Sequence, residues 1–326
     1  MIRLVVLVVL VVLFGNVSCV FGQVDERVKL EVKGGYTNVK NSIYGYKNGI
    51  IDTQTRVRIF TYKFDSSQHL IELLSHQSQN PSDVKRVYRY DEDGNNTEEV
   101  RYGLGDTVSS WYLYKFDSNH KLINMVRYKS DGTVDRTEMT KYDSNSNKIE
   151  WMWLLSDNSL NWKEIYKYDI NNNLIEQGRY SRNGSLFWKN TFTYNEKGYK
   201  IAEVKYSSYG SDSTKTEYKY NNLGRKIEEV NYTSDGVIER AISNNYDDAG
   251  NPVESIQFNP DKSLHLKVIR LFDTKGNVIE ETWYKEPNIV SSKRVNKYDE
   301  YGNLLEQIDY NNLNEPGVKI EFIYSK

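Results

Sequence analysis

The sequence predicts an all-β protein in which tandem 26-residue β-hairpin repeats form one long, curved antiparallel meander sheet, an open solenoid. Three observations lead to this prediction: a fixed period, two kinds of short turn within each period, and strand-length runs between the turns. An aromatic anchor marks the period, and Asp or Asn follows it in every copy but the last. The anchors are Phe64, Tyr90, Phe116, Tyr142, Tyr168, Tyr194, Tyr220, Tyr246, Phe272, Tyr298 and Tyr324.

Each repeat contains two short turns whose residues suit β-hairpins. The first turn reads Asp-x-x-Gly-Asn, as in Asp91–Asn95 and Asp299–Asn303. Its Asp can accept a hydrogen bond from the backbone two residues on, and its Gly tolerates a positive φ. The second turn reads Ser-Asp-Gly or a relative, as in Ser130–Gly132 and Ser234–Gly236. Turns this short join antiparallel neighbours, whereas parallel strands need long crossovers, so the sheet is predicted to be antiparallel.

The stretches between the turns are about eight residues long and rich in Tyr, Ile, Val, Glu and Lys, a length that suits strands and not helices. Aromatic pairs across such a sheet contribute roughly 0.2–1 kcal/mol each. A column of Glu and a column of Lys predict ladders of ion pairs on a solvent-exposed face of the sheet. Each exposed pair stabilises the fold by about 0–1 kcal/mol. About 22 strands in one sheet should curl. The ladder residues include Glu98, Glu150, Glu228, Glu306, Lys141, Lys167, Lys219 and Lys297.

Residues 1–22 predict a secretory signal peptide that is cleaved from the mature chain. Arg3 supplies the positive start, and Leu4–Phe14 is an unbroken apolar run that is short for a membrane span. We therefore expect no integral membrane span in the mature chain. Lipidation at Cys19 is the alternative to cleavage after Gly22. Cys19 is the only Cys, so cleavage leaves no disulfide and no thiol nucleophile.

The rest of the chain divides into two parts. Residues 23–55 predict an irregular N-terminal cap or a decayed repeat, and residues 56–326 form the repeat domain. The last predicted strand, Val318–Tyr324, would leave an open edge, which invites self-association. Removing Arg3 with the leader leaves 42 basic residues against 45 acidic ones, because the whole chain has 43 and 45. This balance excludes a general affinity for nucleic acid.

The motifs YDEYGNL at Tyr298–Leu304 and YDEDGN at Tyr90–Asn95 resemble the YD repeats of the RHS family. The resemblance covers about residues 56–326. It implies an exported bacterial protein with a strand-rich repeat body, which in large members forms a hollow shell around a toxic C-terminal segment. This chain is much smaller and more regular, and no variable toxin segment follows its repeats. It is more similar to short YD-repeat proteins with a signal peptide, common in Bacteroidetes-type bacteria.

The sequence contains no arrangement that predicts catalysis, a metal or a cofactor. No His pair has zinc-motif spacing, and no nucleophile elbow or phosphate-binding loop is present. The Glu column repeats one environment, whereas an acid–base pair needs two different ones. We therefore expect no enzyme. The four His are His69, His76, His120 and His265.

The candidate binding patch lies where the repeat departs from its own pattern. Nine and eleven residues after the anchor most copies are polar, but one copy has Trp151 and Trp153, and Trp283 occupies the same column further on. Side chains alternate along a strand, so Trp151 and Trp153 should share a face. Exposed aromatics there could stack on sugar rings or dock a partner; the alternative is packing under other parts of the chain. Trp162 and Trp188 recur at another column, which favours packing.

From these features we expect an exported, non-enzymatic repeat protein of the cell envelope, in the periplasm, at the cell surface or outside the cell. Its expected role is binding or scaffolding, through contact of the extended sheet with a glycan or an envelope protein. One alternative is a structural spacer or self-assembling surface protein joined through its edge strands. Another, which follows from the family resemblance, is an RHS-associated accessory or immunity-type protein.

Overall fold

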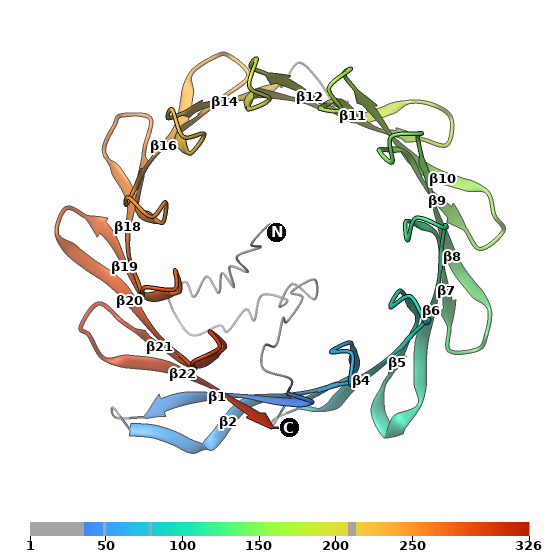
Figure 1. The fold of residues 1–326 in the computed structure, drawn as a ribbon, viewed down its shortest axis with the longest axis horizontal. Coiled ribbons are helices and arrows are strands. Elements are labelled where there is room, and N and C mark those ends of the chain that lie inside the picture. The colour runs from blue at the N-terminus through green and yellow to red at the C-terminus, as the bar shows by residue number, and fades with distance from the viewer. Residues whose placement is uncertain (1–35, 48–49, 78–79, 208–212, 326) are drawn as a thin grey trace.

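The computed structural model describes residues 36–47, 50–77, 80–207 and 213–325, and its strands form one 22-stranded antiparallel sheet. Strands pair in chain order, and β1 also pairs with β22, so the sheet closes into a barrel, seen along its axis in Figure 1. One 3-10 turn, η1 (Leu104–Asp106), precedes β6. The strands are β1 (Asn38–Lys47), β2 (Ile50–Phe64), β3 (Leu70–Gln77), β4 (Asn80–Tyr90), β5 (Asn96–Tyr102), β6 (Val108–Phe116), β7 (Leu122–Lys129), β8 (Val134–Tyr142), β9 (Lys148–Leu155), β10 (Leu160–Tyr168), β11 (Leu174–Ser181), β12 (Leu186–Tyr194), β13 (Lys200–Ser207), β14 (Thr214–Tyr220), β15 (Lys226–Tyr232), β16 (Ile238–Tyr246), β17 (Pro252–Phe258), β18 (Leu264–Phe272), β19 (Val278–Glu286), β20 (Ile289–Tyr298), β21 (Leu304–Tyr310) and β22 (Pro316–Ser325).

Closure of the barrel corrects the open solenoid predicted from the sequence. Strands β1 and β22 pair from Asn38 opposite Ser325 to Gly45 opposite Val318, so the expected open edge at the C-terminal strand is covered. Pairing the first strand with the last removes the unpaired backbone groups that both edges would otherwise present. Strand β1 lies in the part expected to be an irregular cap or a decayed repeat. The predicted leader and Cys19 lie outside the described residues.

The ten turns that follow an anchor, here called the anchor turns, form the narrow end of the barrel. In Figure 1 their tips lie inside the ring, whereas the tips of the other hairpins that the structure describes project outside it. Asp169 shows the predicted turn chemistry: its Oδ1 accepts the backbone N–H groups of Asn171 and Asn173 at 2.9 and 2.8 Å. Neighbouring turns also touch, since Asn147 Nδ2 donates to Asn172 Oδ1 over 2.9 Å. The narrow end is therefore tied together from turn to turn.

The anchor tyrosines link each repeat to the one before it. The Tyr168 hydroxyl donates to the Lys148 carbonyl oxygen, 20 residues earlier, over 2.9 Å. The same bond recurs in the other repeats with a Tyr anchor, and a Phe anchor such as the buried Phe64 contributes packing alone. The eight bonds of this kind are donated by Tyr90, Tyr142, Tyr168, Tyr194, Tyr220, Tyr246, Tyr298 and Tyr324.

The two faces of the wall differ in burial. Most buried polar side chains lie on the face that carries the anchors, including Glu99, Glu164, Glu281 and Arg294, whose residues are 3–8% exposed. Side chains converge on the concave side of a curved sheet and spread on the convex side. The anchor face is therefore the inner wall of the barrel. Within the described part of the chain there is a single sheet, so the burial seen there comes from crowding of side chains on one layer.

The outer face carries the charge ladders predicted from the Glu and Lys columns. Glu150 pairs with Lys141 at 2.7 Å and with Lys163 at 3.4 Å, across three strands. Glu306 repeats this arrangement with Lys297 and Lys319, both at 2.7 Å. Lys141 and Lys297 are well exposed, so their pairs are worth about 0–1 kcal/mol each, whereas Lys319 and Glu306 are largely covered. Among the described residues, no helix has the length and apolar character needed to cross a membrane.

Candidate binding site on the inner wall

The candidate site is a row of paired side chains at one height on the inner wall, here called the inner belt. Each pair joins the residue eleven places after one anchor to the residue six places before the next anchor. Because the period contains no insertion, every pair of this kind lies at the same level of the barrel. The belt from β7 to β14 contains, in order, the cross-strand pairs Arg127–Arg136, Trp153–Trp162, Arg179–Trp188 and Lys205–Thr214.

Three tryptophans gather in the middle of the belt. Trp151 and Trp153 lie on the inner face of β9, as their spacing predicts, and Trp162 faces them from β10. The ring of Trp162 is 4.8 Å from that of Trp151, edge to face, and 5.8 Å from that of Trp153. All three are partly exposed. The cluster therefore presents aromatic surface to the interior of the barrel.

The third tryptophan of the predicted patch is not part of this cluster. Trp283 lies on β19, ten strands from β9, and its ring contacts Arg294 at 5.6 Å. In contrast, Trp162 and Trp188, which sequence reasoning assigned to packing, belong to the belt. Two repeat positions considered together could have found them. Antiparallel pairing brings the residue eleven places after one anchor opposite the residue six places before the next anchor, and Trp162 and Trp188 occupy the second of these positions.

A buried carboxylate holds the belt in place beside the tryptophans. Glu164, 3% exposed, accepts hydrogen bonds from Arg179 Nη2 at 2.6 Å and from Gln177 Nε2 at 3.1 Å. It also accepts the Tyr166 hydroxyl hydrogen bond, and burial together with this bond raises the pKa of Tyr166. Burial lowers the pKa of Lys148, whose Nζ lies 4.3 Å from the Tyr166 ring. Fully satisfied buried networks of this kind are rigid.

Guanidinium groups stack on the belt tryptophans. Arg179 lies 4.0 Å from the centre of the Trp162 ring and 5.7 Å from that of Trp188. Arg136 lies 6.0 Å from the centre of the Trp153 ring. Each such contact contributes about 0.5–2 kcal/mol, depending on how dry it is. The stacking fixes the tryptophan orientations and leaves cationic edges between them.

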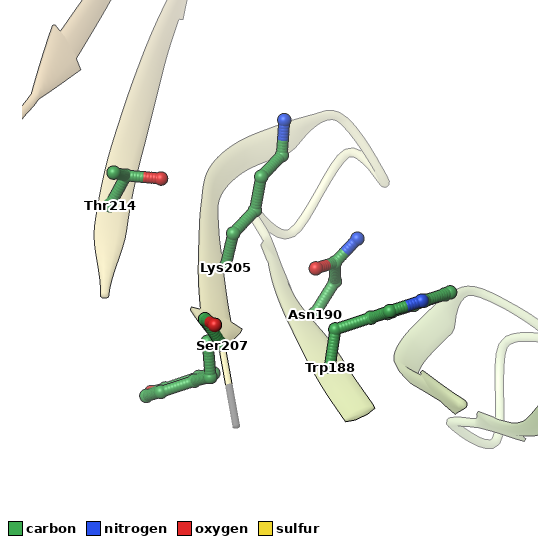
Figure 2. A pocket seen from close by; sticks show the side chains of 6 residues that line it. Trp188, Asn190, Lys205, Ser207 and Thr214 are labelled. Atoms are coloured by element: carbon green, nitrogen blue, oxygen red, sulfur yellow. The ribbon is translucent and has the colours of Figure 1, made fainter. Parts of the chain in front are cut away.

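A shallow depression continues the belt beyond Trp188 (Figure 2). It has a volume of about 370 Å³, and in the figure Trp188, Asn190 and Lys205 project from neighbouring strands. Thr214 stands opposite Lys205 on the next strand. The remaining lining residues are Tyr206 and Ser207.

The other sequence candidates lie apart from this site. His69 contacts Asp65 at 3.0 Å and stacks on Tyr90, so it belongs to an anchor turn. His120 bonds Asn95 in the same ring of turns. The side chain of His76 lies outside what the structure describes. Within the described ranges, no three His, Cys, Asp or Glu side chains are grouped so as to hold a metal ion.

Comparison with known proteins gives weak likenesses. No family model matches the chain, and no curated protein matches its sequence. A Tc holotoxin pore structure from Photorhabdus luminescens aligns with 86% of this chain at 13% identity and a TM-score of 0.30, and this chain spans 18% of that one. A porin-like protein of Bacteroides uniformis aligns over 90% of this chain and 98% of its own, at 9% identity and a TM-score of 0.35. A porin-like protein of Bacteroides vulgatus aligns over 87% of this chain and 97% of its own, at 6% identity and a TM-score of 0.21.

Proposed function

We propose that the protein is an exported, non-enzymatic binding protein that holds a glycan against the inner wall of its barrel. The observation that carries this proposal is the Trp153–Trp162 pair, which is partly exposed and flanked in register by Arg127–Arg136 and by Arg179–Trp188. Sugar rings present apolar faces that stack on aromatic rings, and hydroxyl edges that need hydrogen-bonding groups. Binding sites commonly combine an apolar aromatic surface with a few fixed polar groups.

The belt is held ready before any ligand arrives. Glu164 fixes Arg179, and Arg179 in turn lies against both Trp162 and Trp188. Side chains that are already ordered lose little conformational freedom on binding, which raises affinity. Rigid aromatic side chains are suited to this role because they offer a large contact area with few rotatable bonds.

The barrel is wide enough to admit a chain-like ligand. At about 4.8 Å per strand, 22 strands give a circumference of at least about 105 Å and a backbone diameter of at least about 34 Å. The outer wall carries Lys–Glu ladders, and a Lys at the centre of a bilayer would cost about 2–4 kcal/mol. We therefore propose that both walls stand in water, with the ligand inside.

The proposal is tested by binding of the mature chain, residues 23–326, to a glycan array and by titration calorimetry with each sugar retained. The Trp153→Ala/Trp162→Ala variant should lose about tenfold or more in affinity, because aromatic contacts of this kind are worth about 1 kcal/mol each beyond their buried area. Trp111→Ala is the matched control, since Trp111 stacks on Tyr128 on the outer face, with ring centres 5.0 Å apart.

Two results would overturn the proposal. One is that the array retains no glycan at all. The other is that a glycan binds the belt variant and the Trp111→Ala control equally well while circular dichroism shows both to be folded. A further control, Trp283→Ala, removes a tryptophan from the same column on a distant part of the ring and should leave the affinity unchanged.

A further inference from the structure

We infer that the glycan is acidic, with carboxylate, sulfate or phosphate groups that dock on four arginines beside the belt tryptophans. This inference rests on the proposed function and names its ligand class. Arg86 and Arg101 face each other across β4 and β5, and Arg127 and Arg136 across β7 and β8. All four side chains are on the inner wall and are 11–35% exposed.

The repeat provides its own comparison for the first pair. Arg294 and Asp309 occupy the same two repeat positions as Arg86 and Arg101. There the guanidinium donates to both carboxylate oxygens, over 2.7 and 3.1 Å, so the pair satisfies itself. In β4 and β5 the acid is replaced by a second arginine. Like charges directly opposite each other in a sheet are unfavourable. Glu99 contacts both guanidinium groups, at 4.0 Å from Arg86 and 2.6 Å from Arg101, and its single charge leaves the pair one positive charge in excess.

The second pair shows the same excess. Arg127 and Arg136 occupy the belt positions that hold Trp153 and Trp162 one repeat later. Asp135 lies 3.1 Å from Arg127 and 3.9 Å from Arg136. Even so, the Arg127 Nε–H is buried and meets no acceptor among the described residues. A buried donor left without a partner costs about 1–3 kcal/mol, which a bound anionic oxygen would recover.

The charges near the belt tryptophans are positive on balance. Six cationic side chains line this part of the inner wall: Arg86, Arg101, Arg127, Arg136, Lys148 and Arg179. The four acids that contact or face them are Glu99, Asp135, Glu138 and Glu164. One positive charge of this excess belongs to the arginine pairs, where four arginines meet Glu99, Asp135 and Glu138, and the other belongs to Lys148 and Arg179, which share Glu164.

The geometry joins the two kinds of contact in one ligand. Arg136 belongs to an arginine pair and also lies 6.0 Å from the Trp153 ring. A sugar stacked on Trp153 would therefore present its substituents to Arg136, and the next sugar along the wall would reach Arg127. Guanidinium groups bind carboxylates and sulfate or phosphate esters through paired N–H donors, which gives direction as well as charge.

The test compares sugars that differ only in charge. Calorimetry with the mature chain uses an oligogalacturonide and its methyl ester, and a heparin-type oligosaccharide and its desulfated form. We expect at least one acidic member to bind about tenfold or more tightly than its neutral partner, with an affinity that falls as salt rises. The pair that shows the preference identifies carboxylate or sulfate as the recognised group; an inorganic phosphate titration covers the third anion.

Arg127→Gln/Arg136→Gln should abolish the preference for the acidic sugar, measured as the ratio of the acidic to the neutral affinity, so that any loss of stacking between Arg136 and Trp153 affects both sugars and cancels. The matched control is Arg240→Gln, because Arg240 stands at the repeat position of Arg136 but faces Asn231. Equal binding of acidic and neutral sugars would overturn this inference and leave the proposed function intact. Equal binding of a single-stranded DNA of the same charge would also overturn it, because charge alone would then suffice. Absence of binding by every sugar would overturn both.

Discussion

The closed seam between β1 and β22 predicts that a disulfide can join the two ends of the sheet. Lys40 and Ile323 are direct partners across the seam and both are exposed, Ile323 by 62%, so replacing them with Cys disturbs little packing. Partners in an antiparallel pair have Cα atoms about 4.5–5.5 Å apart, within the range of roughly 4.4–6.8 Å that a disulfide requires. The mature chain expected from the sequence contains no competing Cys.

The size of the effect follows from the length of chain enclosed. The bond between positions 40 and 323 closes a loop of about 284 residues, for which the chain-entropy relation gives an upper bound of about 5.6 kcal/mol of stabilisation, with 2–4 kcal/mol typical. In an open sheet the same residues would stand on opposite edges, up to about 100 Å apart at about 4.8 Å per strand. Such a sheet could form only disulfides between molecules.

The assay oxidises Lys40→Cys/Ile323→Cys at low protein concentration and follows it by non-reducing electrophoresis, peptide mass spectrometry and urea unfolding with and without reductant. We expect a monomeric cross-linked species with a higher unfolding midpoint when oxidised. The control pair, Lys40→Cys/Ile170→Cys, combines the same first position with a residue that is 97% exposed in a distant turn, and it should stay reduced. Dimers alone from the seam pair would refute closure.

Two further predictions concern the anchor turns. Gly224→Ala should cost about 2–4 kcal/mol in urea unfolding, because Gly224 has a φ of +75° and a Cβ would lie 2.7 Å from Tyr199 Cζ. Gly236→Ala, at φ +82° with open space around it, should cost only about 1–2 kcal/mol. Equal costs for the two substitutions would contradict the contact between Gly224 and Tyr199 of the neighbouring anchor turn. Hydrogen bonds from the Asn173 side chain and backbone hold the pKa of Asp169 below its usual value. The stability that Asp169 contributes is therefore present above about pH 4 and lost as pH falls further. In thermal melts, Asp169→Asn should be less stable than wild type at pH 7 and equal to it near pH 2. A difference in melting temperature that does not shrink as pH falls would contradict this reasoning.

The repeat, its turns and its outer ladders could be predicted because each depends on residues close in sequence. Closure could not, since β1 does not continue the anchor column: Tyr44 stands 20 residues before Phe64 instead of 26. The partner of Trp153 lies in a different column of the repeat, so inspection of one column at a time does not find it. A register shift between Leu160 and Trp162 in the pairing of β9 with β10 changes which columns meet across these strands. Column spacing alone therefore placed Trp162 with the packing residues.

Because the period is uniform, positions whose residue changes from copy to copy indicate roles other than folding. Residues that every repeat needs for folding recur in nearly every copy, as the anchor tyrosines and the anchor turns show. At the belt positions the residues instead change from copy to copy, and the arginine and tryptophan pairs follow one another in neighbouring repeats from β7 to β12. The pair Asp309–Val318 fills the same positions on β21 and β22 without forming such a cluster. Folding thus does not require Arg or Trp at this level, and their concentration on one arc of the ring supports the proposed binding site there.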